Sequence, residues 1–323
     1  MTKVLILRFS SIGDIVLTTP VIRAVKNQVK DAEVHYCTKS NFKAIVESNP
    51  NVSKVHCLGD SLHELIMELQ KEKFDYVVDL HNNLRTTIIK SRLGVKAKSF
   101  DKLNFKKWLL VNWKINRLPS KHIVDRYLEA ASELGVKADS AGLDYFIPEK
   151  DEVSLNSLPA EFRNGFVAFA IGAQHFTKRL PIHKIEELAR KISQPVLLMG
   201  GKEDAETGDK IVQTLAAENR FIFNACGKFN LNQSASLIKQ SNLVFSHDTG
   251  LMHIAAAMGK EIYSIWGNTV PAFGMYPYKT NYHSIENLNL SCRPCSKIGY
   301  NKCPKGHFKC MNEQNFDFLN GKL

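Results

Sequence analysis

The first group of residues that could do chemistry is Arg8-Phe-Ser-Ser-Ile-Gly-Asp14, directly after an apolar run. Ser10 and Ser11 can offer hydroxyls to a ligand or to the turn, and Gly13 permits close approach to the backbone. Asp14 lies at the expected start of a helix, where a carboxylate stabilises the helix as a cap. The same position also suits a general base that takes a proton from a substrate hydroxyl.

A second group is His247-Asp-Thr-Gly-Leu-Met-His253, which also follows an apolar run. Thr249 and Gly250 fall where the next helix begins, and the free amides of a helix N-terminus bind phosphate. His253, on the first turn of that helix, is either a structural histidine or a ligand-binding one. The Asp-Thr-Gly triplet also occurs in aspartic proteases, but the Ala-rich helix that follows excludes their all-β lobes.

Charged residues in two further loops could hold a nucleotide. Lys178 lies in the loop 172–181, ahead of a helix opened by a proline, and a cation there can neutralise a diphosphate. Glu203 follows Gly200-Gly-Lys and can accept hydrogen bonds from ribose hydroxyls, as acids after Rossmann strands do. The alternatives are an ordinary polar loop for Lys178 and a helix-capping region for Glu203.

Four of the seven cysteines gather near the end of the chain, at Cys292, Cys295, Cys303 and Cys310, with His307 among them. Only one C-x2-C pair is present and the remaining spacing is irregular for zinc. We therefore favour free or redox-sensitive thiols over zinc or disulfides. The chain also lacks the Asp-x-Asp motif of metal-bridged sugar-nucleotide transfer, so no metal is expected at the site.

The elements that must position these residues alternate between β-rich runs and helical patterns, which predicts βαβ units and parallel sheets. Strands are expected at Val4–Phe9, Glu33–Thr38, Lys54–Leu58, Tyr76–Leu80, Phe166–Ile171, Pro195–Gly200, Phe221–Ala225, Leu243–His247 and Ile262–Trp266. Helices are expected over 14–29, 41–48, 62–73, 83–93, 182–193, 204–219, 232–241 and 251–258.

This pattern restarts after a polar, proline-bounded stretch at 147–159, which predicts two Rossmann-like domains in tandem, 1–155 and 156–323. Ligands of such sheets bind outside the carboxyl ends of the strands, so two domains facing each other would share one cleft. Neither G-x-G-x-x-G nor a P-loop occurs, which leaves ordinary dinucleotide and P-loop sites unsupported.

The net charge of +11 is uneven, because residues 96–122 hold eight Lys or Arg residues and one acid, Asp101. Such a stretch binds nucleic acid, a membrane surface or a phosphorylated substrate, or it is a solvated face. No nucleic-acid-binding motif accompanies it. No apolar run reaches the ~18 residues of a membrane span. We find no secretory signal and expect a cytosolic protein.

Taken together, these motifs resemble the bacterial lipopolysaccharide heptosyltransferases of glycosyltransferase family 9 over nearly the whole chain. The matching segments are Arg8–Asp14 with Leu17-Thr-Thr-Pro20, Asp79-Leu-His-Asn-Asn-Leu-Arg85, the Lys178 loop, Gly200–Glu203, His247–His253 with Trp266-Gly, and the late Cys-rich loop. The resemblance implies a GT-B fold with a first, acceptor-binding domain and a second domain that binds the nucleotide sugar.

The resemblance further implies an enzyme that transfers heptose from ADP-L-glycero-D-manno-heptose to the lipopolysaccharide inner core, with inversion and without a metal. Asp14 would be the base that deprotonates the acceptor. Residues on the donor side would be Ser10, Gly13, Lys178, Glu203, Asp248, Thr249, Gly250, Leu251 and His253. Arg85, Lys106 and Lys107 would bind the phosphorylated lipid A–core acceptor, and the protein would work peripherally at the anionic cytoplasmic face of the inner membrane.

Three alternatives stay open at this point. One is a member of the same family that uses another nucleotide sugar or acceptor, since selectivity depends on few pocket contacts. Another is a sugar-nucleotide epimerase of similar architecture, which would turn over its substrate without an acceptor. A more remote one is a nucleic-acid-binding protein on an inactive scaffold, whose affinity would fall steeply with salt.

Overall fold

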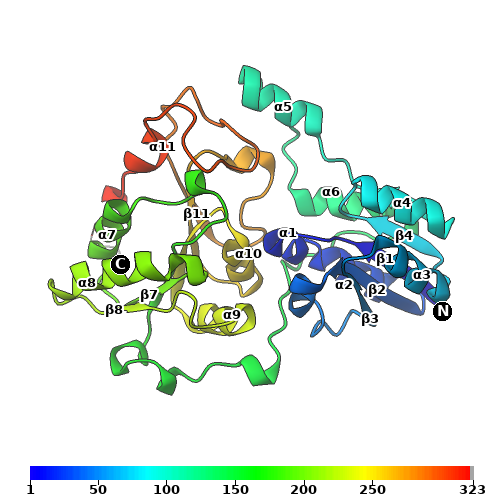
Figure 1. The fold of residues 1–323 in the computed structure, drawn as a ribbon, viewed down its shortest axis with the longest axis horizontal. Helices are drawn as coiled ribbons and strands as arrows, with labels where there is room; N and C mark the ends of the chain where they lie inside the picture. The colour runs from blue at the N-terminus through cyan, green and yellow to red at the C-terminus, as the bar shows by residue number, and fades with distance from the viewer. Residues whose placement is uncertain (321–323) are drawn as a thin grey trace. The chain divides into compact units, whose positions relative to one another are not determined.

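The computed structural model describes residues 1–320. These residues form two compact units (Figure 1), one of residues 1–103 and 121–146 and one of residues 104–120 and 147–320. The sequence predicts a division at 155/156, whereas the units part after Phe146, and the segment 104–120 groups with the second unit. Within residues 1–320, no helix is long and apolar enough to cross a membrane.

The first unit is built on a five-stranded parallel sheet in the order β3-β2-β1-β4-β5. Its strands are β1 (Thr2–Leu7), β2 (Ala32–Lys39), β3 (Lys54–Leu58), β4 (Tyr76–Asp79) and β5 (Lys96–Ser99). Its helices are α1 (Ile12–Val16), α2 (Thr19–Gln28), α3 (Leu62–Glu72), α4 (Leu84–Leu93) and α6 (Ile123–Ala130), with short 3-10 helices η1 (Ser40–Ile45) and η2 (Ser132–Leu134).

Apolar strands and local caps explain why these elements form. Val4 to Leu7 in β1 are fully buried because helices cover the central strand on both faces. The side chain of Asn83 begins α4 by accepting from the Thr86 amide at 3.0 Å, and Gly94 ends it with a φ of 64°. Each helix is thus delimited by residues that satisfy its end groups.

Two expectations for this unit are wrong. The single helix over 14–29 is instead α1 and α2, because Pro20 has no N–H with which to continue the backbone ladder through this point. The helix over 41–48 is the 3-10 helix η1. The sequence reading also missed β5, whose Lys-Ala-Lys-Ser sequence at an exposed sheet edge carries no apolar pattern.

The second unit holds a six-stranded parallel sheet in the order β11-β10-β9-β6-β7-β8. Its strands are β6 (Val167–Ala170), β7 (Val196–Met199), β8 (Ile222–Asn224), β9 (Leu243–His247), β10 (Ile262–Trp266) and β11 (Tyr282–Glu286). Its helices are α5 (Asn104–Trp113), α7 (Ile182–Arg190), α8 (Ala205–Ala216), α9 (Leu231–Gln240), α10 (Gly250–Ala257) and α11 (Lys309–Asn312). Short 3-10 helices are η3 (Glu149–Asp151), η4 (Leu155–Ser157), η5 (Ala160–Phe162), η6 (Phe176–Lys178), η7 (Lys202–Asp204), η8 (Pro271–Phe273) and η9 (Asp317–Leu319).

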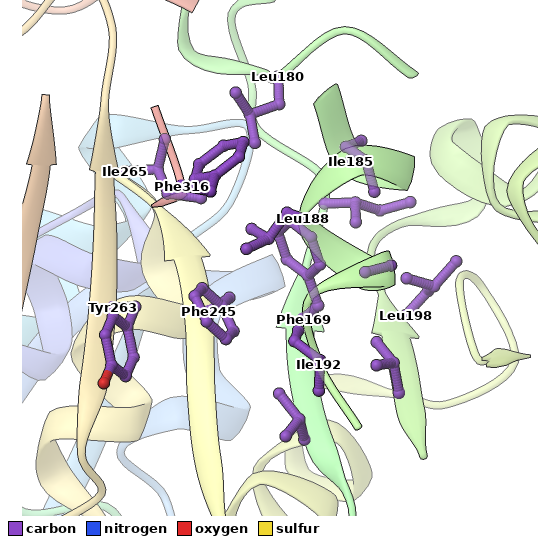
Figure 2. Close-up of a cluster of buried hydrophobic side chains, with 14 of the residues drawn as sticks. Phe169, Leu180, Ile185, Leu188, Ile192, Leu198, Phe245, Tyr263, Ile265 and Phe316 are labelled. Carbon is purple, nitrogen blue, oxygen red and sulfur yellow. The ribbon is translucent and has the colours of Figure 1, made fainter. Parts of the chain in front are cut away.

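The core of this unit lies between one face of the sheet and the helix α7 (Figure 2). Phe169 and Phe245 on adjacent strands meet with ring centroids 5.8 Å apart, and Leu188 of α7 is fully buried beside them. Phe316, close to the end of the chain, joins the same cluster and is itself fully buried. The C-terminal segment is therefore part of this fold.

Both sheets are doubly wound, and this fixes where ligands bind. In the first sheet the chain moves from β1 outward to β3 and then returns to β4 on the other side; in the second it moves from β6 to β8 and returns to β9. Crevices of such sheets open at the carboxyl ends of the two strands where the winding reverses. The loops after β1 and β4, and after β6 and β9, are therefore the places for functional groups.

Gly208 in α8 offers a test of this packing. A methyl group at Gly208 would lie 2.3 Å from Oδ1 of Asn224, whose amide is fixed by bonds to Ala205 at 2.9 Å and Asp209 at 2.7 Å. We expect Gly208→Ala to lower the free energy of unfolding by about 1–3 kcal/mol, measured by urea unfolding, because overpacking outweighs the better helix propensity of alanine. Gly59→Ala is the control, since a methyl there meets nothing within 4 Å. A neutral or stabilising Gly208→Ala would contradict this account.

Candidate active site

The buried guanidinium of Arg8 organises the loop that follows β1. Its Nε donates to the carbonyl of Ser10 at 2.7 Å, and its Nη1 donates to the carbonyl of Leu80 at 2.6 Å and to the Tyr127 hydroxyl at 3.0 Å. The remaining nitrogen, Nη2, lies 2.8 Å from Oδ1 of Asp14. One side chain therefore ties the ends of β1 and β4 to α1 and α6.

The charge of Arg8 depends on Asp14. Burial lowers the pKa of Arg8, but the nearby carboxylate of Asp14 and the hydroxyls of Tyr127 and Tyr36 raise it, and the balance lies above its ordinary value. A buried cation without a partner would be strongly destabilising. The ion pair is thus the condition under which this guanidinium can occupy the crevice end of the sheet.

Asp14 also helps to cap α1, whose N-cap residue is Ser11. The Oδ2 of Asp14 accepts from the backbone N–H of Ser11 at 3.2 Å, as in a capping box, and from the Ser11 hydroxyl at 2.9 Å. The Asp14 side chain nevertheless keeps 19% of its surface exposed. The carboxylate is fixed in position by three bonds and still reaches solvent, which is the geometry that a positioned proton acceptor needs.

His81 lies at the same end of the sheet and is not among the site residues predicted from the sequence. It follows β4, and its ring meets Phe9 edge-on with centroids 5.2 Å apart. Burial, with the charges of Arg8 and Lys102, lowers the pKa of His81 to about 4, so the imidazole is neutral at pH 7. No residue of the described chain bonds its buried Nδ1. Its place directly after β4, one of the two strands between which the winding reverses, could have singled it out from the sequence.

In the second unit, the structure brings Lys178 and Asp248 together from two loops. Lys178 ends the 3-10 helix η6 after β6, and its Nζ lies 2.6 Å from Oδ2 of Asp248, which follows β9. The same oxygen accepts from the Thr269 hydroxyl at 2.9 Å. Both side chains of the pair are mostly buried. A cation is thereby held at the second winding reversal, where an anionic ligand is expected.

The helix α10 begins beside this ion pair. Thr249 is its N-cap residue in an extended conformation, and its side chain makes no cap hydrogen bond. The amides of Gly250 and Leu251 therefore lie in a first turn whose N–H groups are available to an anion. His253 is buried on this turn and 2% exposed, which places it behind the loop.

A buried carboxylate, Asp204, shapes the neighbouring loop and was not singled out from the sequence. Its Oδ1 lies 3.2 Å from Nη1 of Arg179, and its Oδ2 accepts from the amide of Gly201 at 2.9 Å. A methyl on Gly172 would come within 2.1 Å of this carboxylate, so the glycine is needed for the close approach. Burial raises the pKa of Asp204. Glu203, the predicted ribose ligand, is exposed in the same 3-10 helix.

Comparison with known proteins decides the class. Residues 62–304 match the profile of glycosyltransferase family 9 (heptosyltransferase). The chain belongs to glycosyltransferase family 9. This glycosyltransferase is 24% identical over 313 residues to the lipopolysaccharide heptosyltransferase 1 of Campylobacter coli, and the match covers 88% of each chain.

Solved structures confirm the predicted GT-B architecture. A family 9 glycosyltransferase from Veillonella parvula superposes with a TM-score of 0.74 at 22% identity, covering 89% of this glycosyltransferase and 86% of that chain. The E. coli ADP-heptose lipopolysaccharide heptosyltransferase II superposes with a TM-score of 0.72 at 20% identity, covering 97% and 98%. The α/β fold with two parallel sheets is therefore that of the heptosyltransferases.

The predicted acceptor residues of the glycosyltransferase do not gather in one unit. Arg85 is exposed on the first turn of α4 in the first unit. Lys106 and Lys107 lie on α5, which groups with the second unit. Their role toward an acceptor stays a prediction.

The late cysteines of the glycosyltransferase form no disulfide within the described chain. Burial raises the pKa of Cys310 to about 12, and it also raises the pKa of Cys295. Within residues 1–320, the one group of three metal-ligand side chains whose ligand atoms lie within 4.8 Å of one another is His35, His56 and Glu72, away from these thiols. The interpretation of the four late cysteines as free thiols stays a prediction.

His247 generates a prediction about pH. Its Nε2 accepts from the amide of Leu180 at 3.0 Å, and full burial lowers its pKa from 6.5 to about 4. A histidine that folds in the neutral form loses stability as the pH falls from 6.5 toward 4, because the unfolded chain takes up the proton first. We expect the protein to be about 2 kcal/mol less stable at pH 5 than at pH 7 through this residue alone.

Thermal unfolding of His247→Gln at both pH values measures this contribution, since the glutamine oxygen can keep the bond to Leu180. The variant should lose less stability than wild type between pH 7 and pH 5. His183→Gln, at an exposed position on α7, is the matched control and should follow wild type. Equal pH dependence in wild type and His247→Gln would refute the assignment.

Proposed function

We propose that this glycosyltransferase moves a heptose from ADP-L-glycero-D-manno-heptose to the lipopolysaccharide inner core, with inversion at the anomeric carbon and without a metal. The observation that carries the proposal is that each winding reversal holds one organised ion pair, Arg8–Asp14 after β1 and Lys178–Asp248 after β6 and β9. Its relatives are named as heptosyltransferases of lipopolysaccharide, one of them with ADP-heptose.

The second unit would bind the donor. Lys178 and the amides of Thr249, Gly250 and Leu251 would neutralise the diphosphate, with Asp248 holding the lysine in place through their 2.6 Å contact. His253 would support the first turn of α10 from behind. Glu203 would accept hydrogen bonds from the ribose hydroxyls. Ser10 and Gly13, from the loop after β1, would contact the sugar of the donor.

Transfer would proceed in one displacement. An acceptor hydroxyl gives its proton to the carboxylate of Asp14, and its oxygen forms a bond to the anomeric carbon on the face opposite ADP. The bond between that carbon and the diphosphate oxygen breaks, and its electron pair leaves with ADP. Lys178 and the amides of α10 stabilise the charge that develops on this leaving group. One inversion at the anomeric carbon follows from a single displacement.

The assignment of the acceptor-binding residues rests on charge complementarity. Lipid A with a phosphorylated core is anionic, and Arg85, Lys106 and Lys107 are basic residues suited to bind it. We further propose that the enzyme works peripherally at the anionic cytoplasmic face of the inner membrane, where this acceptor would be met. A preference for UDP or GDP over ADP in thermal-shift measurements would redirect the donor assignment, and turnover without an acceptor would favour an epimerase.

Replacement of Asp14 tests its role as the base. Asp14→Asn keeps an oxygen that can accept from the Ser11 amide, but it removes both the base and the charge that pairs with Arg8. Urea unfolding of the variant measures the stability lost with the ion pair, and the activity is compared under conditions where the variant is folded. We expect kcat/KM for heptose transfer to fall by ~10²-fold or more, with ADP affinity unchanged, because general-base catalysis is typically worth 10²–10⁴-fold. The readouts are ADP release and isothermal titration with ADP.

Ser11→Ala is the control for the cap, because it removes the hydroxyl contact of 2.9 Å and leaves the carboxylate. It should cost far less activity than Asp14→Asn. If Asp14→Asn retains near-full activity, Asp14 is only a cap and the base lies elsewhere.

Lys178→Met tests the diphosphate assignment. Loss of a charge-assisted hydrogen bond of about 1.5–3 kcal/mol should weaken ADP binding by about 10- to 100-fold in isothermal titration. Lys210→Met, on the exposed face of α8, removes the same charge from the same unit and should leave ADP binding unchanged. Equal affinities for Lys178→Met and wild type would remove Lys178 from the donor site.

A further inference from the structure

The helix α5 presents aromatic rings to solvent. Phe105, Trp108 and Trp113 are 70%, 50% and 66% exposed. The rings of Phe105 and Trp108 stack with centroids 6.3 Å apart, and those of Trp108 and Trp113 lie 6.5 Å apart, so the three form one continuous patch. Clustered exposed aromatics of this kind mark a surface that binds something apolar.

Very little of α5 is used for packing. Leu110 is the one buried residue within the helix. Beyond its end, the Nζ of Lys114 donates to the carbonyls of Cys292 at 3.1 Å and Pro294 at 2.6 Å, which attaches this segment to the Cys-rich loop of the same unit. The helix is therefore held in place from its C-terminal end while its aromatic face stays uncovered by the described chain.

Basic residues flank the aromatic patch along the chain. Lys106 is exposed on the helix itself, and Arg117 is exposed shortly after it, while the single acid between residues 96 and 122 is Asp101. Aromatic rings flanked by cations match the boundary of an anionic bilayer, where tryptophans lie among headgroups and cations contact phosphates. Ten residues rise about 15 Å, too short to span a bilayer, so such a helix would lie in the plane of the surface.

We propose that α5 docks the protein on an anionic lipid bilayer, with Phe105, Trp108 and Trp113 inserted at the headgroup boundary and the flanking cations on lipid phosphates. This role for α5 names the element by which the proposed enzyme would contact the membrane. It rests on the proposed function only for the identity of that membrane, the bacterial inner membrane. Docking itself depends on the exposed rings and the charge alone.

Intrinsic fluorescence reports on this helix directly. The chain has three tryptophans, and Trp266 is 1% exposed, so Trp108 and Trp113 give the solvent-sensitive signal. With the full chain, vesicles of phosphatidylglycerol and phosphatidylethanolamine should shift the emission to the blue and carry the protein in flotation. Pure phosphatidylcholine vesicles and high salt should do so much less, because part of the binding is electrostatic.

A triple variant, Phe105→Ala, Trp108→Ala and Trp113→Ala, should reduce binding to anionic vesicles by ~10-fold or more, since the buried apolar surface is lost. Phe221→Ala is the matched control, because Phe221 is an exposed aromatic of the same unit, 56% exposed, outside α5. Far-UV circular dichroism checks that both variants are folded. Lys106→Glu should weaken binding to anionic vesicles and should make that binding less sensitive to salt.

Unchanged flotation of the triple variant, or no blue shift in wild type, would overturn the proposal. If sedimentation velocity instead shows wild type as a dimer that the triple variant abolishes, with vesicle binding absent, the patch is a contact between copies of the chain. Activity with a delipidated acceptor separates the two proposals. If wild type transfers heptose neither to that acceptor nor to a heptose-deficient lipopolysaccharide in detergent, while α5 still controls vesicle binding, the proposed function fails and docking stands.

Discussion

The need to neutralise the buried guanidinium of Arg8 constrains the whole first crevice. This group occupies the point where the winding of the sheet reverses, and it bonds carbonyls at the ends of β1 and β4. A cation in that place requires a carboxylate, and Asp14 supplies it at 2.8 Å while capping α1. The cap and the base interpretations are therefore two consequences of one geometry. These contacts hold the Asp14 carboxylate in one position without a substrate. A general base is effective when it is positioned in advance in this way.

The second unit also holds a mostly buried ion pair, but here the carboxylate positions the cation. Asp248 is fixed by Lys178 and by the Thr269 hydroxyl, and the anion thereby positions the cation. A lysine held next to the first turn of α10 supplies positive charge from two sources, a side chain and the backbone amides. The proposed diphosphate site would therefore need no glycine-rich phosphate loop. The close packing of Asp204 on Gly172 fixes the shape of the neighbouring loop.

The sequence predicted the interior of this fold better than its edges. β9 and β10 lie at the predicted residues because buried parallel strands are continuous apolar runs. The edge strands β5 and β11 were missed, since half-exposed edges carry polar residues such as Lys96 and His283. Asp14 and Lys178 could be singled out because they follow predicted strands. His81 follows a predicted strand too, so its position could have been noticed, but its low pKa depends on Arg8, which only the folded chain brings near. The pairing of Asp204 with Arg179 likewise depends on the fold.

A single displacement assisted by a positioned carboxylate inverts the anomeric carbon, so the configuration of the product reports on this mechanism. Heptose would be transferred from ADP-heptose to a heptose-deficient lipopolysaccharide in the presence of EDTA, and the anomeric configuration of the new linkage would be read by NMR. The account predicts transfer that continues in EDTA and gives a linkage of opposite configuration to the donor. A retained configuration, or transfer that stops in EDTA and returns with a divalent metal, would contradict it.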